Sequence, residues 1–186
     1  SLSRRQRQMC IRDSYKEADG ALALPVSPSM VEGCMLNAEY LDTRFQDMDP
    51  VVAERMILGR DISAVDYAKT LHEMHKLRAS SKTTLRNIDA LLVPTCMVPA
   101  RPVSEVDASL DSYMEHARIY MRNCFVGNLL DLCAVSVPCG FTSKGLPIGL
   151  MIYAKPLHED IALRVAQTFE KTTDWHKQRP DLSWIT

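Results

Sequence analysis

The stretch 128–149, NLLDLCAVSVPCGFTSKGLPIG, constrains the fold of this chain more than any other part of it. Two apolar blocks, Leu132–Val137 and Leu146–Tyr153, are too short for helices and are bounded by turn residues. Blocks of this length and setting are typical of strands inside a sheet. Between them, Ser143-Lys144-Gly145 is polar and contains a glycine, as turns usually do. The stretch therefore predicts two strands joined by a short polar connection.

Helical and strand patterns alternate along the rest of the chain. Ser63 and Asp49-Pro50 specify helix starts, because serine and aspartate cap helix N-termini and proline is tolerated at the first helical position. We expect helices at 29–41, 50–58, 63–87, 109–132 and 156–172, and strands at 89–95, 133–141 and 147–155. Residues 15–28 are expected to be a loop or the remnant of a preceding element, and the proline-rich segment 96–107 is expected to be a loop. This alternation predicts an α/β fold.

The overall charge argues against partners that are bound mainly through electrostatic attraction. The formal net charge is −1 at pH 7, which argues against a nucleic-acid or membrane-surface partner. No apolar run approaches the length needed to span a bilayer. The six cysteines form no CxxC pair, and free thiols are typical of a reducing compartment. We therefore expect a cytoplasmic protein.

The segment 1–14, SLSRRQRQMCIRDS, differs from the rest of the chain. Four arginines (Arg4, Arg5, Arg7 and Arg12) are accompanied there by the single acidic residue Asp13. A basic arm of this kind is one way to bind nucleic acid, but the string also resembles a translated library adaptor. We interpret residues 1–14 as a non-native segment and exclude them from fold reasoning.

Three separate strings resemble the C-terminal half of the amidase signature family. They are DALLVP at 89–94 followed by Thr95, the stretch 128–149 itself, and PLHED at 156–160 leading into a helix. Their order and spacing match that family over roughly 38–182. The resemblance implies a mixed β-sheet flanked by helices on both faces. It also implies hydrolysis of, or transfer across, a carbon–nitrogen amide bond of a small-molecule amide, without a metal or an organic cofactor.

The family's catalytic residues have no counterpart in this sequence. The resemblance implies a lysine and two serines, one of them in a Gly-Gly-Ser-Ser-Gly-Gly type loop whose backbone N–H groups hold the oxyanion. The chain's only Ser-Ser pair, Ser80-Ser81, lies in a predicted helix, and none of its seven glycines is adjacent to another. We therefore expect residues 15–186 to be the C-terminal part of a single amidase domain. Its N-terminal catalytic half would lie outside this chain, which alone is expected to be inactive.

Three hypotheses for function remain at this point. The string Asn-Leu-Leu-Asp-Leu at 128–132 resembles the general amidase and allophanate hydrolase branches, which favours an amide hydrolase acting by a Ser-Ser-Lys mechanism. The A subunit of a glutamyl/aspartyl-tRNA amidotransferase typically has Asn-Leu-Ala-Gly-Leu-Pro there, and it would need partner subunits and a charged tRNA. The third hypothesis is a non-catalytic scaffold or binding protein derived from the family.

Three residues near the end of the predicted helix 109–132 are candidate substrate-binding residues: Cys124, Asn128 and Asp131. The resemblance implies a threonine or another polar residue near the substrate at position 124, and an asparagine later in the same string, at position 128. Asn128 could instead cap the backbone. A buried Asp131 would have a raised pKa and could act as an acid or a base, or it could pair with Arg122.

Other suggestive residues favour structural interpretations. His72 and His75 are three apart, whereas the zincin helix needs histidines at i and i+4, so we predict no zinc site there. Ser136 lacks the flanking glycines of a nucleophile elbow. Cys139 has no histidine nearby in the sequence. We expect both Ser136 and Cys139 to pack in the core.

Overall fold

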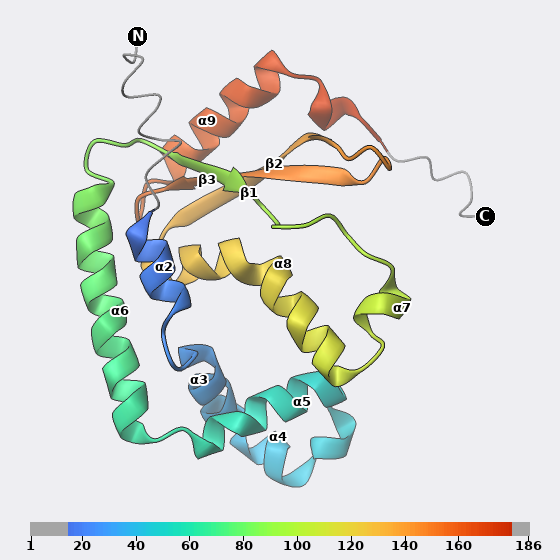
Figure 1. Cartoon of the computed structure of the whole chain (residues 1–186). Helices are drawn as coiled ribbons and strands as arrows, with labels where there is room; N and C mark the ends of the chain where they lie inside the picture. The colour runs from blue at the N-terminus through green and yellow to red at the C-terminus, as the bar shows by residue number, and fades with distance from the viewer. Residues whose placement is uncertain (1–14, 180–186) are drawn as a thin grey trace.

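A three-stranded sheet separates one helix from a layer of several others (Figure 1). The computed structural model describes residues 15–179. Residues 180–186 and the segment 1–14, which we expect to be non-native, lie outside the described part. The strands are β1 (Leu91–Pro94), β2 (Cys133–Phe141) and β3 (Pro147–Ala154), in the order β1-β3-β2. Both pairings are antiparallel, and an irregularity interrupts the β2–β3 register between Pro138 and Gly140.

The predicted pair of strands forms a hairpin, and its turn is built from the expected polar residues. The amide of Gly145 donates to the carbonyl oxygen of Thr142, and the amide of Thr142 donates to that of Leu146. The hydroxyl oxygen of Thr142 also accepts from the amides of Lys144 and Leu146. Gly145 has φ +78°, a left-handed conformation that glycine adopts without steric cost. The hairpin prediction is confirmed.

The helices surround the sheet on both faces. They are α2 (Lys16–Leu22), α3 (Pro28–Leu36), α4 (Ala38–Thr43), α5 (Pro50–Ile57), α6 (Ala64–Thr84), α7 (Val103–Val106), α8 (Leu110–Leu130) and α9 (Glu159–Thr172). The side chains of Asp49, Ser63 and Ser109 accept hydrogen bonds from the amides at the starts of α5, α6 and α8, and so cap these helices. The helix starts predicted from capping residues are therefore confirmed at Asp49 and Ser63.

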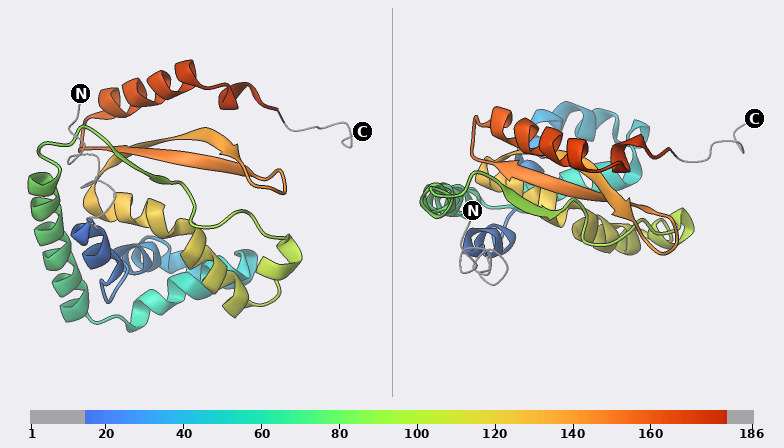
Figure 2. Two further views of the ribbon diagram at one scale, coloured as in Figure 1. Left: turned by 45° about the horizontal axis from the view of Figure 1, so that its top comes forward. Right: turned by 90° about the horizontal axis from the view of Figure 1, so that it is seen from above.

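Helix α9 covers one face of the sheet, and several helices cover the other (Figure 2). Helix α9 packs on one face through a buried cluster of Val137, Ile152 and Ala166. Helix α8 lies against the other face, and behind it α2 and α6 complete a second apolar cluster. The predicted α/β fold class, with helices on both faces, is confirmed. Within residues 15–179, no helix is both long and apolar enough to cross a membrane.

Helix α2 forms within residues 15–28, where we expected a loop or the remnant of a preceding element. Its carboxylate Glu17 is buried, accepting hydrogen bonds from the hydroxyls of Ser80 (2.6 Å) and Thr84 (2.8 Å) on α6. Burial alone would raise the pKa of Glu17, but these two hydroxyls hold it below its usual value. Partners more than sixty residues away fix this helix, which explains why the local sequence pattern did not reveal it.

Two further boundaries differ from the sequence-based prediction. The helix expected at 29–41 is two helices, α3 and α4, which meet at Asn37. The Asn37 side chain donates to the carbonyl oxygen of Gly33 at 2.9 Å, a local hydrogen bond that competes with helix continuation. The loop expected at 96–107 contains one short helix, α7.

Close packing of α8 on the sheet depends on Gly127. A Cβ atom at this position would lie 2.4 Å from Cε1 of Tyr153, far inside van der Waals contact. We expect Gly127→Ala to lower the free energy of unfolding by about 1–3 kcal/mol, because the ring of Tyr153 is itself buried. Gly33→Ala is the control, since a Cβ atom there would meet only Met56 Cγ at 3.8 Å. It should stabilise the helix by about 0.5–1 kcal/mol. Urea denaturation of both variants checks this pair, and equal effects would contradict the packing account.

Candidate functional site

Helix α8 is joined to the sheet by two hydrogen bonds, one buried and one partly buried. Nδ2 of Asn123 donates to the carbonyl oxygen of Pro94, at the end of β1, at 2.6 Å. The hydroxyl of Tyr153 on β3 donates to the carbonyl oxygen of Asn123. Asn123 is only 8% exposed, so its amide group needs this partner. These contacts position every α8 side chain relative to β1 and β3.

The burial of Tyr153 changes its titration. Desolvation, followed by the neighbouring Cys124, raises the pKa of Tyr153 to about 12. The phenol therefore stays protonated at neutral pH and keeps donating to Asn123.

The three candidate residues from the sequence lie along one side of α8. Cys124 and Asn128 are four positions apart within α8, a spacing that puts them on a common helix face, and Asp131 follows the last helical residue. Cys124 is half-buried, whereas Asn128 and Asp131 are exposed. None of them lines either of the two large cavities described below. The side chain of Asn128 makes no hydrogen bond to another of residues 15–179, so the backbone cap considered for it is not formed.

Asp131 ends helix α8. It has φ +62°, the left-handed conformation common at helix C-termini. The amide of Leu132 then donates to the carbonyl oxygen of Gly127 at 3.0 Å. The ion pair considered with Arg122 is not formed. Arg122 instead donates to Oδ1 of Asn123 at 3.4 Å and contacts the sulfur of Met97. Asp131 is thus not the buried acid that the sequence suggested.

One cavity, here called the arginine cavity, lies among α2, α3, α5 and α8 and encloses about 690 Å³. Three arginines line it, Arg55 from α5 and Arg118 and Arg122 from α8, with Asp19 as the acidic residue among its described lining. Most of its other lining residues are apolar, including Met30, Met114, Met121 and Phe125. Guanidinium groups on an apolar wall suit a ligand with an apolar body and a carboxylate.

Sequence reasoning missed this cavity because its walls come from distant segments. The spacing of Arg118 and Arg122 at i, i+4 on a predicted helix was the one local signal available. Nothing in the local pattern connects Arg55 with them.

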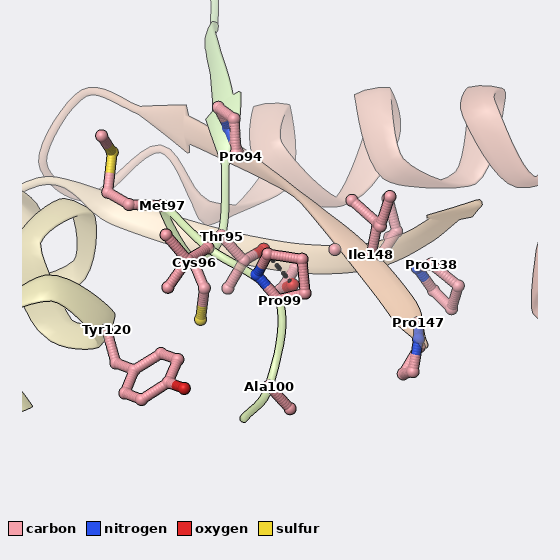
Figure 3. A pocket seen from close by; sticks show the side chains of 14 residues that line it. Pro94, Thr95, Cys96, Met97, Pro99, Ala100, Tyr120, Pro138, Pro147 and Ile148 are labelled. Carbon is pink, nitrogen blue, oxygen red and sulfur yellow. Dashed lines mark hydrogen bonds between the residues drawn. The ribbon is translucent and has the colours of Figure 1, made fainter. Parts of the chain in front are cut away.

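The second cavity, here called the proline cavity, lies beside the sheet on the face that α8 covers (Figure 3). It encloses about 610 Å³. Its described lining consists of Pro94–Ala100, Tyr120, Ser136–Pro138 and Pro147–Gly149. The hydroxyls of Thr95 and Ser136 are 2.6 Å apart at its floor.

The expectation that Ser136 and Cys139 pack in the core is wrong for Ser136. Ser136 is exposed, because alternate residues of β2 point to opposite faces of the sheet and its neighbour Val137 takes the α9 side. Cys139 is half-buried, and its thiol donates to the carbonyl oxygen of Ile148 at 3.5 Å. Burial raises the pKa of the Cys139 thiol, which disfavours the reactive thiolate.

The serine pair on α6 has a structural role. Ser80 bonds to Glu17, and the hydroxyl of Ser81 bonds to that of Tyr15. Both contacts hold α2 against α6. Among residues 15–179 no group of three or more histidine, cysteine, aspartate or glutamate side chains could hold a metal ion.

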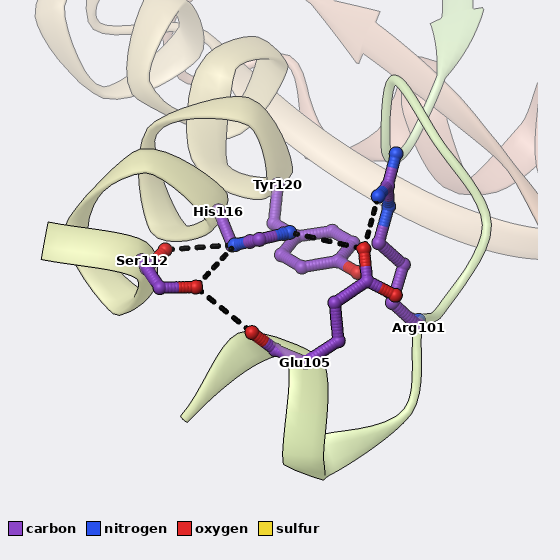
Figure 4. A network of polar contacts seen from close by, with 5 residues as sticks. All are labelled: Arg101, Glu105, Ser112, His116 and Tyr120. Carbon is purple, nitrogen blue, oxygen red and sulfur yellow. Dashed lines mark hydrogen bonds and ion pairs between the residues drawn. The ribbon is translucent and has the colours of Figure 1, made fainter. Parts of the chain in front are cut away.

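A polar network fastens the segment between β1 and α8 (Figure 4). Glu105 pairs with Arg101 and lies 3.8 Å from Nε2 of His116, while Nδ1 of His116 contacts the carbonyl oxygen of Ser112 at 2.7 Å. The amide of Arg101 donates to the hydroxyl of Tyr120 at 3.1 Å. Through these contacts α8 holds the loop that forms one wall of the proline cavity.

The family of this chain follows from comparison with known proteins. Residues 22–163 match the amidase family. The chain belongs to the amidase family. Solved structures share the fold of this amidase chain: Kluyveromyces lactis allophanate hydrolase aligns over 91% of this chain and 29% of its own, with a TM-score of 0.73 and 22% identity. The 6-aminohexanoate cyclic dimer hydrolase aligns over 93% and 38%, with a TM-score of 0.69 and 19% identity.

Curated relatives of this chain include A subunits of glutamyl-tRNA(Gln) amidotransferases. The glutamyl-tRNA(Gln) amidotransferase A subunit from Thermodesulfovibrio yellowstonii is 33% identical over 81% of this chain and 31% of its own length. Its counterpart from Methanosarcina mazei is 36% identical over 74% and 29%. The chain thus spans about a third of the curated relatives it matches. These relatives do not support the expectation that the chain lies closer to the allophanate hydrolase branch.

Substitution of Asn123, which is buried and hydrogen-bonded, should destabilise the protein more than substitution of exposed Asn128. We expect Asn123→Ala to lower the free energy of unfolding by about 1–3 kcal/mol, because the carbonyl oxygen of Pro94 would lose its donor inside the protein. Asn128→Ala should change it by less than about 0.5 kcal/mol, since the side chain is exposed. Chemical denaturation measures both, and a larger loss for Asn128→Ala would contradict the assignment.

The raised pKa of Tyr153 predicts a pH dependence. A folded-state pKa of about 12 against an ordinary 10.0 means that the protonated phenol stabilises the fold below about pH 10. This contribution is lost as the pH rises toward 12. The free energy of unfolding should therefore fall more steeply from pH 10 to 12 in the unsubstituted chain than in Tyr153→Phe. Parallel curves would show that Tyr153 is not the responsible group. Other tyrosines titrate in both proteins and cancel in the difference.

Proposed function

We propose that this chain is the C-terminal part of an amidase signature enzyme that cleaves a carbon–nitrogen amide bond of a small molecule. In this proposal a serine of the rest of the domain attacks the amide carbonyl, and a second serine and a lysine transfer the proton. The observation that carries the proposal is the family match over residues 22–163. The sequence has no glycine-rich serine loop, which supports a nucleophile outside this chain.

The edges of the sheet support the presence of further chain in the whole enzyme. Within residues 15–179, β1 and β2 each have one edge without a partner strand. Leu92 on β1 is 53% exposed. Unpaired edges with exposed apolar side chains are usually covered in native proteins. The rest of the amidase domain is the partner that we propose for them.

The arginine cavity supplies the proposed substrate preference. Arg55 forms no ion pair or hydrogen bond with another of residues 15–179, and it is half-buried. A half-buried cation without a partner binds a ligand carboxylate more strongly than an exposed one does, because partial burial weakens the competition from water. We therefore propose an amide substrate that also carries a carboxylate, bound through Arg55, Arg118 and Arg122. Cys124 and Asn128 do not line this cavity, so any contact that they make with the substrate would lie outside it.

A second candidate function has its own support. The curated relatives are glutamyl-tRNA(Gln) amidotransferase A subunits, at 33–36% identity for the two described above. In that case the reaction would need partner subunits and a charged tRNA. The discriminating observation is whether the full-length protein co-purifies with other subunits and transfers ammonia to tRNA-bound glutamate.

The test of the proposed function uses the full-length enzyme. Succinamate and butyramide are primary amides of similar length, and only the first carries a carboxylate. We expect ammonia release from succinamate, with Arg55→Met raising its KM about tenfold or more, as the loss of a charge-assisted hydrogen bond implies. Butyramide turnover should stay within about twofold of its original value.

Arg60→Met is the matched control. Arg60 is exposed and pairs with Asp42 away from the cavity, so its loss should leave the KM for succinamate unchanged. Failure to hydrolyse any primary amide would contradict the amidase proposal. Equal effects of the two substitutions would contradict only the role proposed for the arginine cavity and would leave the amidase proposal intact.

A further inference from the structure

We propose that the proline cavity binds a neutral small molecule that carries a carbonyl group and apolar groups. This site goes beyond the proposed function, which puts a carboxylate-bearing amide in the arginine cavity on another side of α8. The volume of about 610 Å³ lies within the range of pockets that hold small ligands.

The lining of the cavity excludes a charged ligand. None of the 14 residues that line it in the described part of the chain is Asp, Glu, Lys, Arg or His. A charged group transferred there from water would find no opposite charge to offset its lost hydration. The lining is mainly apolar, and four prolines (Pro94, Pro99, Pro138 and Pro147) form much of its walls. Because proline has no backbone N–H, these positions offer a ligand no main-chain donor.

The remaining polar groups are hydroxyls, and they can donate. Thr95 and Ser136 bond to each other through their side-chain oxygens, which uses only one of their two hydroxyl hydrogens. Tyr120 accepts from the amide of Arg101, so its own hydrogen is not used in that bond. Figure 3 shows the Tyr120 ring at one side of the cavity and the Thr95–Ser136 bond near its centre. Two hydroxyl hydrogens in a neutral, apolar cavity suit a carbonyl oxygen as acceptor.

Gly149 keeps the floor of the cavity in this form. A Cβ atom there would lie 2.7 Å from Oγ1 of Thr95 and 2.9 Å from Oγ of Ser136. Any side chain at position 149 would thus displace the two hydroxyls. The amide of Thr95 also donates to the carbonyl oxygen of Gly149 at 2.8 Å, which fixes Thr95 beside β3.

The wall opposite the sheet is also held in place before a ligand arrives. The segment that includes Pro99 and Ala100 is tied to α8 through the bond from Arg101 to Tyr120 and through the network of Glu105 and His116 (Figure 4). A preformed wall lowers the ordering cost of binding.

The experiment titrates this chain with acetanilide, a neutral aryl amide, and follows backbone amide resonances by NMR. We expect saturable shifts at Thr95, Ser136 and Gly149, with a dissociation constant on the order of 1 mM for a ligand this small. Ser136→Ala and Tyr120→Phe should each weaken binding about five- to tenfold, as the loss of one neutral hydrogen bond implies. Phenylacetate has a similar size but carries a charge, and it should not shift these resonances.

Ser143→Ala is the matched control, because Ser143 is exposed in the hairpin turn and does not line the cavity. It should bind acetanilide as the unsubstituted chain does. The proposal is overturned if no saturable shifts occur or if they map elsewhere. It is also overturned if the two hydroxyl variants bind unchanged, or if phenylacetate binds equally well at Thr95 and Ser136. The mapping on the unsubstituted chain decides the matter even if one variant does not fold. This experiment measures binding and not catalysis. A negative result would therefore leave the amidase proposal intact.

Discussion

The contact of α8 with the sheet is the constraint on which the rest of this structure depends. Gly127 lets the helix approach Tyr153 more closely than any other residue would allow, and the Tyr153 hydroxyl then reaches the carbonyl oxygen of Asn123. The Asn123 side chain extends the same connection to Pro94 at the end of β1. A helix fixed at this depth brings different side chains to two separate cavities, because its faces point in different directions.

The two cavities differ in chemistry although one helix lines both. Arg118 and Arg122 give the arginine cavity a positive character, whereas Tyr120 is the only α8 residue among the described lining of the proline cavity. Because of this difference in charge, the arginine cavity suits a ligand with an anionic group, and the proline cavity suits a ligand with a neutral carbonyl. In the amidase proposal, α8 would be a partition between a substrate pocket and a second binding site.

Local patterns in the sequence predicted the parts of the fold that depend on local interactions. The hairpin follows from apolar blocks around a glycine-containing turn, and Asp49 and Ser63 cap their helices through neighbouring amides. Helix α2 depends instead on Glu17 reaching Ser80 and Thr84, contacts that no local pattern contains. The candidate site divides in the same way: Cys124, Asn128 and Asp131 came from local resemblance, while the arginine cavity combines α8 with α2, α3 and α5, which lie far from it in the sequence. Asp131 was considered as a buried acid, but it is exposed and ends helix α8 in a left-handed conformation. This helix end depends on the backbone conformation rather than on the residue type.

We propose that this chain forms part of a larger amidase domain whose catalytic residues precede it. The measurement that tests it most directly is the sequence of the source DNA upstream of the codon for Tyr15. We expect an open frame that continues upstream and encodes a lysine and a glycine-rich loop with paired serines. An in-frame stop or a start codon immediately upstream would contradict it, and a non-catalytic scaffold or binding role would then replace the amidase proposal.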